Sequence, residues 1–458
     1  MNVTHKLAAL LIVVLAGSGA CRAAEMRGAW VTAWTAGFFT PEQVDATVAA
    51  AKACGLNALF IQVRKNADAY YVSDLEPSGA EIPQGFDPLA DIIEKAGKHG
   101  IEIHAWMNTF RVWTAKDPPA DPKHIVNRQP GWINRNSSGA DRSSEGFYLD
   151  PGVPEAREHI AAVAEDIAKR YNVHGIHLDY IRYPGKDWGY SDAALGRYLA
   201  ATGANSRPQP ADPKWAAWRR DQVTQLVRMI STRVRAARPG VRVTAATIPW
   251  GDCPAEYTAS SPYATVLQDW RAWLSDGLLD ANIPMNYKVE SNAKTAQQFR
   301  NWLTAFKKWG GGRPVYVGID VNNNDVAAVR RQMEAIRKAG LDGFVWFSFN
   351  SSRRRASLVE AFGSKSSSAV SQSAGSDSRS EFEKGIRYAS ANRLGMAKVH
   401  LRRAIELDPG CAEAHFRLGR CYLRERNTGK AVEYFRNTLE LDAAHEGAKR
   451  ELSSLGLE

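Results

Sequence analysis

One segment of the chain combines acidic, basic and aromatic side chains at a spacing typical of a strand that borders a reaction site. Residues 175–184 read Gly-Ile-His-Leu-Asp-Tyr-Ile-Arg-Tyr-Pro. Side chains alternate between the two faces of a strand, and in a barrel one face packs on helices while the other points inward. The alternation turns two side chains inward, His177 and Asp179, and places three against the helices, Ile176, Leu178 and Tyr180.

Asp179 is the candidate catalytic carboxylate of this segment. An inward-facing carboxylate costs several kcal/mol unless it is hydrogen-bonded or paired with a cation. Arg182, three residues later, or Arg64 could supply that cation. A structural ion pair beneath a cleft is the alternative explanation of the same pattern.

Four further acidic residues are candidates for a second catalytic carboxyl group. Each lies just after a predicted strand or in the connection that follows one, and barrel enzymes carry their active sites in these positions. Asp150 directly precedes a predicted helix, so capping of that helix explains it equally well. The other three could instead be surface residues. The four candidates are Asp68, Asp150, Asp320 and Glu290.

Aromatic and amide side chains gather where the predicted strands end. Trp and Tyr offer flat apolar faces with one polar group, which suits stacking on sugar rings. Asn and Arg can hold hydroxyl groups. The candidate substrate-binding residues are Arg64, Trp106, Asn108, His177, Arg182, Trp250, Asn286, Tyr287, Trp346 and Asn350.

The sequence gives no support for a metal or a nucleotide cofactor. His104 and His177 lie in predicted barrel strands without a third ligand at recognisable spacing, so core histidines are the better interpretation. No Gly-rich phosphate loop follows any predicted strand, and Gly310–Gly312 closes a helix. We expect no metal and no cofactor.

Eight apolar runs alternate with amphipathic helical stretches between residues 26 and 362. Near-continuous apolar strands, each followed by a helix, are typical of a parallel (β/α)8 TIM barrel with helices outside. A doubly wound open sheet is the alternative. The expected strands are 27–31, 57–63, 102–107, 175–181, 241–248, 281–285, 315–319 and 343–347, and the expected helices are 41–55, 88–100, 154–171, 214–237, 293–309 and 326–339.

Two long connections, 108–150 and 184–213, follow strands at the carboxyl-terminal face. In barrel enzymes the connections at this face form the reaction site, so we expect them to wall a cleft.

The first 24 residues resemble a secretory signal. A short start with His5 and Lys6 precedes an apolar run too short to span a bilayer, and small residues follow it. Cys21 resembles a lipoprotein processing site without the usual Leu three residues earlier. We expect an exported protein of the periplasm or cell envelope that reaches a membrane only through an N-terminal lipid.

Two different segments follow the predicted barrel domain, 25–363. Residues 364–380 are Ser-rich and predict a flexible linker. In 381–458, matching residues recur at an offset of about 34, the tetratricopeptide period. The matched pairs include Gly385 with Gly419 and Tyr388 with Tyr422. We expect an all-α repeat module that docks on the barrel or on a protein partner.

The composition is that of a globular protein. Lys and Arg number 59 against 49 Asp and Glu, a formal net charge of +10. This balance favours an anionic neighbour. The export signal and the absence of a basic-aromatic module argue against nucleic acid.

Several motifs in order resemble the glycosyl-hydrolase-like family 10 proteins. They cover about residues 26–362, and they are Met-Arg-Gly-Ala-Trp-Val at 26–31, Phe-Ile-Gln-Val-Arg at 60–64, His-Ala-Trp-Met-Asn at 104–108, Tyr-Leu-Asp-Pro-Gly at 148–152 and Gly-Ile-His-Leu-Asp-Tyr at 175–180. The resemblance implies a (β/α)8 barrel in the bacterial envelope, and one branch of the family cleaves peptidoglycan glycan strands stripped of their peptides. This chain departs from the family in having Lys65 after Arg64, and in reading His-Leu-Asp-Tyr where many members carry a second Asp.

These observations favour an exported glycoside hydrolase with a polysaccharide substrate. Glycoside cleavage normally uses two carboxyl groups, about 5–5.5 Å apart for retention and about 6.5–9.5 Å apart for inversion. Asp179 is expected to be nucleophile or base, with the acid among the four other candidates. The alternative is a non-catalytic glycan-binding scaffold whose repeats recruit a partner, which is favoured if no carboxyl group lies within about 10 Å of Asp179.

Overall fold

The structure is a computed structural model that describes residues 25–350, 355–363, 378, 381–390, 392–408 and 410–457. The chain divides into two compact units, Glu25–Gln372 and a second that contains Ser373–Glu458. The predicted signal, 1–24, and all but Ser378 of the predicted linker lie outside the described residues.

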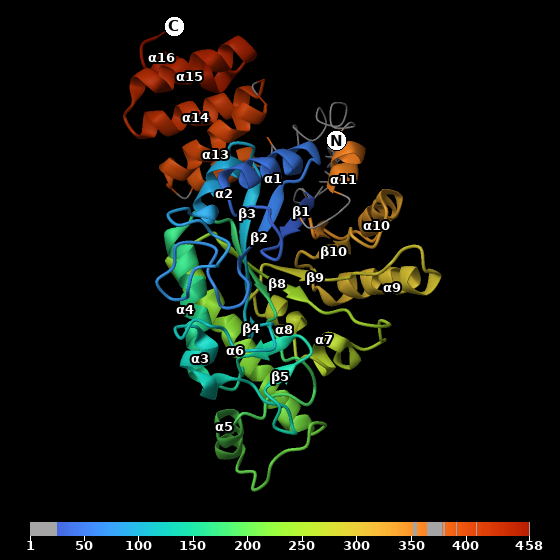
Figure 1. The fold of residues 1–458 in the computed structure, drawn as a ribbon. Coiled ribbons are helices and arrows are strands. Elements are labelled where there is room, and N and C mark those ends of the chain that lie inside the picture. Colours follow the sequence, from blue (N-terminus) through green and yellow to red (C-terminus); the bar gives the residue numbers. More distant parts are fainter. Residues whose placement is uncertain are drawn as a thin grey trace, which may run out of the picture. The chain divides into compact units, whose positions relative to one another are not determined.

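Eight parallel strands form the centre of the first unit (Figure 1). Their order is β10-β11-β1-β2-β3-β7-β8-β9, and a parallel bridge between Asn282 and Val315 joins the two ends. This nearly closed barrel confirms the predicted (β/α)8 fold over the open sheet. The strands are β1 (Met26–Val31), β2 (Ala58–Arg64), β3 (Glu102–Asn108), β7 (Gly175–Asp179), β8 (Arg242–Thr247), β9 (Ala281–Pro284), β10 (Tyr316–Asp320) and β11 (Gly343–Phe347).

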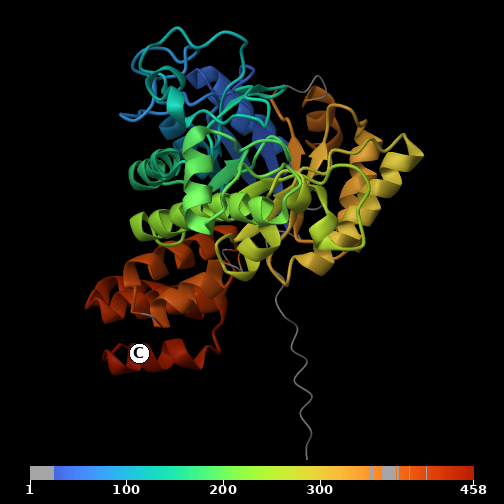
Figure 2. The ribbon, with the colours of Figure 1, turned by 90° about the horizontal axis from the view of Figure 1, so that it is seen from below.

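Helices lie outside the strands (Figure 2). Two of these helices begin at N-capping residues that the sequence shows. The Thr40 side chain accepts a hydrogen bond from Gln43 N, and the Asp87 side chain accepts one from Ala90 N. The main covering helices are α1 (Pro41–Ala53), α2 (Pro88–Gly97), α4 (Pro154–Arg170), α6 (Pro213–Ala237), α9 (Ala293–Trp309) and α10 (Val326–Lys338), and shorter ones are α7 (Ser261–Ala264), α8 (Trp270–Ser275) and α11 (Arg355–Gly363).

The two faces of the strands build two different cores. The outward face packs on the helices, and Ile176 and Leu178 lie there as predicted. The inward face forms a smaller aromatic cluster that contains Trp30, Phe60 and Trp106. Buried polar side chains share this interior, so the barrel is a filled core below its mouth.

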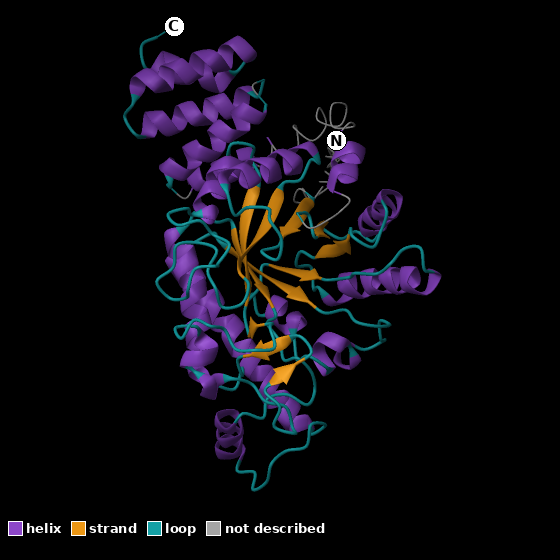
Figure 3. Cartoon of the chain, in the orientation of Figure 1, coloured by secondary structure: helices purple, strands orange, loops and turns teal. Residues whose placement is uncertain are grey.

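The two long connections carry their own small elements. The first contains β4 (Arg111–Trp113), α3 (Ile125–Arg128), a 3-10 turn at Pro130–Trp132, β5 (Arg142–Ser143) and β6 (Gly146–Tyr148). Its strands pair as a separate sheet in the order β4-β6-β5 (Figure 3). The second connection contains α5 (Asp192–Thr202).

The second unit is helical in its described part. Helical residues 381–390 are followed by α13 (Leu394–Leu407), α14 (Ala412–Arg424), α15 (Thr428–Leu441) and α16 (Glu446–Ser454). The repeated glycines make equivalent close contacts: a Cβ built on Gly385 would lie 2.6 Å from Leu401 Cγ, and one on Gly419 would lie 2.7 Å from Phe435 Cε1. These contacts explain why the glycines recur at the tetratricopeptide period.

Within the described ranges, no helix has both the length and the apolar character needed to cross a membrane.

Candidate active site

A cavity of about 380 Å³ opens at the carboxyl-terminal ends of the barrel strands. Side chains reach it from the ends of seven of the eight strands and from the first long connection. Its lining consists of Trp30, Trp34, Gln62, Trp106, Arg111, Glu145, Asp179, Tyr180, Arg182, Ile248, Pro249, Trp250, Met285, Tyr287, Lys288 and Phe347. Five predicted site residues meet here: Trp106, Asp179, Arg182, Trp250 and Tyr287.

Asp179 is the last residue of β7 and lines the cavity with 5% of its surface exposed. Its Oδ1 accepts a hydrogen bond from Tyr180 N at 2.6 Å, and its Oδ2 accepts one from Trp106 Nε1 at 3.2 Å. Burial raises the pKa of the Asp179 carboxyl, and the nearby Arg182 guanidinium opposes that rise without cancelling it. A carboxyl group that holds its proton more strongly than usual suits proton donation.

Glu145 is a second carboxylate at the cavity, and the sequence analysis did not identify it. It lies in the turn between β5 and β6, where its backbone N donates to Ser143 Oγ at 3.1 Å. Tyr148 donates its phenolic hydrogen to the Glu145 carboxylate. The side chain is 30% exposed, far more than that of Asp179.

Arg182 links the two carboxyl groups. Its Nη2 lies 3.0 Å from Glu145 Oε1, and its Nη1 lies 3.8 Å from Asp179 Oδ1. The two terminal nitrogens of one guanidinium are about 2.3 Å apart. Together with the two contact distances, this spacing places Glu145 Oε1 and Asp179 Oδ1 at most about 9 Å apart. This separation falls within the limit of about 10 Å for a glycosidase pair.

Tyr180 differs from the sequence-based expectation. Strand alternation placed it against the helices, but it lines the cavity. The strand ends at Asp179, and Tyr180 adopts a left-handed conformation with φ of 51°. That conformation is uncommon for a residue other than glycine and redirects the side chain. The guanidinium carbons of Arg111 and Arg182 then lie 3.7 and 4.3 Å from the centre of the Tyr180 ring.

Aromatic faces make up much of the remaining wall. Tyr287 and Phe347 stack with ring centres 5.0 Å apart and planes inclined by 19°. Trp34 and Trp250 are 47% and 45% exposed and lie at the rim. Exposed indole faces beside two carboxyl groups suit the binding of sugar rings.

The four other predicted carboxylates do not line this cavity, and two of them bond mainly to backbone groups. Asp150 is fully buried and accepts from Gly152 N at 2.8 Å and Ser191 N at 3.3 Å. Asp68 accepts from Asn66 N at 2.6 Å and Lys65 N at 3.2 Å. These contacts hold loops in place.

Glu290 and Asp320 are also occupied by structural contacts. Glu290 pairs with Arg300 at 2.5 Å, and its side chain is only 4% exposed. Asp320 accepts from Asn323 Nδ2 at 2.6 Å and from Asn322 N at 2.8 Å, which organises the turn after β10.

Three predicted binding residues lie below or beside the cavity. Arg64 is fully buried and pairs with Glu76 at 2.7 Å, so it is not the partner of Asp179. Asn108 Nδ2 donates to Lys65 O at 2.6 Å. Trp30 Nε1 donates to His177 Nε2 at 3.0 Å, which leaves the proton of a neutral ring on Nδ1, 2.9 Å from Thr244 Oγ1.

The remaining three predicted binding residues have neighbours away from the cavity. Trp346 faces the helices, where its ring centre lies 5.1 Å from that of Phe362. Asn286 Nδ2 donates to Phe299 O at 3.2 Å. Asn350 Oδ1 accepts a hydrogen bond from Thr32 N at 2.9 Å, and Asn350 Nδ2 donates one to Thr32 O at 2.7 Å.

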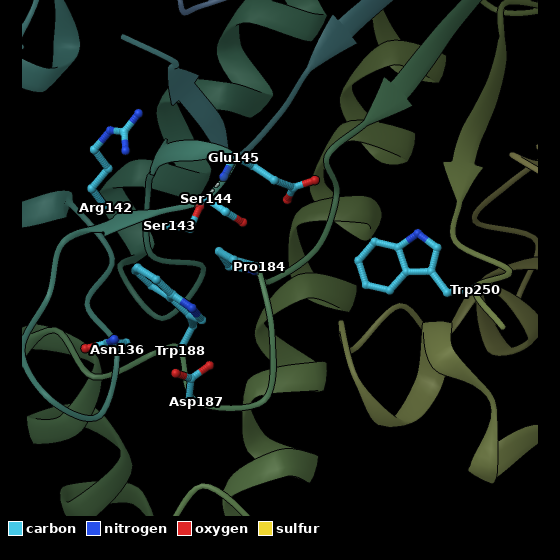
Figure 4. Close-up of a pocket in the computed structure, with 9 residues that line it drawn as sticks. All are labelled: Asn136, Arg142, Ser143, Ser144, Glu145, Pro184, Asp187, Trp188 and Trp250. Atoms are coloured by element: carbon cyan, nitrogen blue, oxygen red, sulfur yellow. Dashed lines mark hydrogen bonds between the residues drawn. The ribbon is translucent and has the colours of Figure 1, made fainter. Parts of the chain in front are cut away.

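A second cavity, of about 440 Å³, adjoins the first because Glu145 and Trp250 line both. Figure 4 shows these two side chains approaching the opening from different elements. The other lining residues come from the two long connections and are Asn136, Arg142, Ser143, Ser144, Pro184, Asp187 and Trp188. Both connections therefore wall the cleft region, as predicted.

No group of three or more His, Cys, Asp or Glu in the described part of the chain is arranged to hold a metal ion. His104 and His177 are fully buried core residues. Burial lowers the pKa of His104 to about 4, despite its contact with Glu102.

The fold and the cavity define a parallel barrel of the kind found in glycoside hydrolases. The family model described as Glycosyl hydrolase-like 10 matches residues 25–332, and a tetratricopeptide repeat model matches residues 412–445. The chain belongs to the glycosyl hydrolase-like 10 family and carries a tetratricopeptide repeat beyond the matched region.

Two curated relatives are similar over the barrel. Glycosyl hydrolase YngK of Bacillus subtilis (strain 168) is 28% identical over 291 residues, which cover 59% of this chain and 54% of that protein. Glycosyl hydrolase DigH of Escherichia coli (strain K12) is 27% identical over 250 residues, which cover 51% of this chain and 55% of that protein. The chain thus spans about half the length of these relatives.

Solved structures share the fold at low sequence identity. The glycoside hydrolase domain of PgaB (BpsB) from Bordetella bronchiseptica has a TM-score of 0.57 at 16% identity, covering 74% of this chain and 99% of that one. Alpha-L-fucosidase isoenzyme 2 from Paenibacillus thiaminolyticus has a TM-score of 0.54 at 11% identity, covering 76% of this chain and 50% of that one.

Proposed function

We propose that the protein is an exported glycoside hydrolase that cleaves O-glycosidic bonds of a polysaccharide, with peptidoglycan glycan strands as its substrate. The observation that carries this proposal is the pair of carboxyl groups, Asp179 and Glu145, held by one guanidinium in an aromatic-walled cavity. Family membership supports the reaction class.

The environments of the two carboxyl groups suit different roles. Asp179 is buried with a raised pKa, so it serves as the general acid that protonates the leaving glycosidic oxygen. This role differs from the nucleophile or base favoured by the sequence. Glu145 is more exposed and paired with Arg182, so it serves as the base that takes a proton from the attacking water. The sugar–oxygen bond breaks as the water oxygen bonds the anomeric carbon.

The decisive experiment incubates the full mature chain with peptidoglycan glycan strands that carry or lack their stem peptides. Product masses report cleavage, and the anomeric configuration of the new reducing end tests the role of Glu145, since a base acting on water inverts it. Asp179→Asn and Glu145→Gln are each expected to lower kcat by about 10²–10⁴-fold.

Asp68→Asn is the matched control, because an amide oxygen can still accept the two backbone hydrogen bonds that Asp68 accepts. It is expected to keep most of the activity. Binding of strands without turnover by the unmodified protein would instead support a glycan-binding scaffold, and equal activity of Asp179→Asn and wild type would remove Asp179 from the mechanism.

The proposal also includes export and a partner for the repeats. The signal-like residues 1–24 and the chemistry of Cys21 support a periplasmic or envelope location. Cell fractionation of wild type and Cys21→Ala tests it: both are expected to be exported, and only wild type can be lipidated at this residue. The helical unit would serve to bind a protein partner.

A further inference from the structure

Three cations and two carboxyl groups line the cavity at the barrel mouth. Arg182 is the cation that lies beside both carboxyl groups. Among the described residues, no carboxylate lies within 4.0 Å of the charged nitrogens of the other two, Arg111 and Lys288. The wall therefore holds positive charge that the protein does not neutralise by direct pairing.

Arg111 is the more buried of these two cations. It lies in β4, is 8% exposed and lines the cavity. Its Nη1 donates to Tyr180 Oη at 2.5 Å, and its guanidinium carbon lies 3.7 Å from the Tyr180 ring centre and 5.5 Å from that of Trp34. Its Nε has no hydrogen-bond partner. Aromatic faces compensate a buried cation only in part, so an anion in the cavity would be stabilised by it.

Lys288 adds a second cation from the loop after β9. Its Nζ donates to two backbone oxygens, of Pro249 at 3.1 Å and of Gly251 at 3.4 Å. Both acceptors are neutral carbonyl groups. Neither acceptor neutralises the ammonium, and its position is fixed at the cavity wall. Burial lowers the pKa of Lys288, and the Asp252 carboxylate opposes that change.

We propose that this cavity selects glycans whose sugars carry carboxylate groups, and that Arg111 and Lys288 receive the carboxylate. A guanidinium matches a carboxylate because its planar fork can donate two parallel hydrogen bonds. The proposal rests on the proposed function, since it names the substrate class of the same site. It predicts weak binding of neutral glycans of equal length.

The test compares two probes that differ only in charge. Peptidoglycan glycan strands freed of their stem peptides bear one carboxylate per muramic acid, and carbodiimide coupling with ammonia converts these groups to neutral amides. Calorimetry with the full mature chain carrying Asp179→Asn measures binding without turnover. We expect the acidic strands to bind at least tenfold more tightly at low salt, with the ratio shrinking as salt is added.

Variants assign the preference to Arg111. Arg111→Gln is expected to weaken binding of acidic strands about tenfold while changing the affinity for amidated strands little, and Arg111→Lys is expected to retain part of the preference. Arg220→Gln is the matched control, because Arg220 also lies 3.7 Å from a tyrosine ring, that of Tyr263, but does not line the cavity. It is expected to bind both probes as the parent does.

The outcomes separate this proposal from the proposed function. Equal affinity for the two probes, or an equal loss for both in Arg111→Gln, overturns the carboxylate preference. If wild type cleaves acidic and amidated strands at equal rates, the preference is overturned while the hydrolase survives. If acidic strands bind selectively and wild type cleaves neither probe, the hydrolase proposal fails and the binding preference stands.

Discussion

Glu145 Oε1 lies 3.0 Å from Arg182 Nη2, and this contact joins the turn between β5 and β6 to the segment that follows β7. It brings a carboxylate from the first long connection to the barrel mouth, beside the carboxyl group that ends β7. Arg182 therefore sets both the position of Glu145 and the electrostatic environment of Asp179.

Replacing Arg182 by Gln is expected to change both rate and pH dependence. Burial raises the pKa of Asp179 and Arg182 opposes the rise, so loss of the cation raises this pKa further. If Asp179 is the general acid, the alkaline limb of the kcat/KM profile moves to higher pH. Loss of the Glu145 contact is expected to lower kcat by about tenfold or more.

Arg182→Lys is the control for this variant. Lysine keeps the positive charge but lacks the planar guanidinium that contacts both carboxyl groups, so kcat is expected to fall. The alkaline limb of the kcat/KM profile is expected to stay near that of wild type. An unchanged profile in Arg182→Gln would contradict the acid role of Asp179.

The stability of Asp179→Asn provides an independent measure of the buried carboxyl. A group whose pKa is raised by folding favours the folded state at low pH and loses that contribution as pH rises through its folded pKa. Burial raises the pKa of Asp179 above its ordinary value of 3.8. Thermal unfolding at several pH values is therefore expected to show Asp179→Asn gaining stability relative to wild type over the range above about pH 4. A constant difference over this range would mean that Asp179 ionises in the folded state as it does in the unfolded one.

The fold was predictable because its signals are local. Apolar runs, capping residues and closing glycines each depend on a few neighbouring residues, and all eight strands lie within a few residues of their expected positions. The repeats were predictable because Gly385 and Gly419 make equivalent contacts.

The site was only partly predictable because its partners are distant in sequence. Asp179 was found from strand alternation, but that rule fails at the next residue, where the left-handed backbone of Tyr180 redirects its side chain. Glu145 lies in a polar turn with no periodicity. Only the tertiary contact with Arg182 distinguishes it from other acidic loop residues.

Glu76 tests the structural role of the residues next to the site. It is buried between Arg64 at 2.7 Å and His159 at 2.9 Å. Burial alone would raise the pKa of Glu76, but Arg64 and His159 outweigh it and lower the pKa to about 2. Glu76→Gln leaves Arg64 buried without a countercharge, so denaturant unfolding at pH 7 is expected to show a loss of about 3–5 kcal/mol.

The pH dependence provides the check on Glu76. A lowered folded pKa gives stability that is present above the unfolded pKa and is lost as pH falls toward about 2. The difference between wild type and Glu76→Gln should shrink over that interval. Glu94→Gln, which removes an exposed pair with Lys98, is the control and is expected to change stability little.

Gly419→Ala tests the packing of the helical unit. The added Cβ would lie 2.7 Å from Phe435 Cε1, so α14 and α15 must separate or the ring must move, at a cost of about 1–3 kcal/mol. Limited proteolysis is expected to cut this unit faster. Gly429→Ala is the matched control, since no atom lies within 4 Å of its added Cβ. Equal protease resistance in Gly419→Ala and wild type would contradict the close packing.

Trp250 is expected to determine how the protein responds to substrate length. It lines both cavities, is 45% exposed and presents an indole face where the two cavities meet. A strand long enough to occupy both cavities contacts this face, whereas a fragment confined to the first cavity loses part of that contact. Trp250→Ala should therefore raise KM for long strands about tenfold and raise it less for short fragments, with kcat changed little, because stacking on a sugar ring stabilises ground and transition states alike. Steady-state kinetics on a length series of strands measures this difference. A uniform rise of KM at every length would mean that Trp250 serves the first cavity alone.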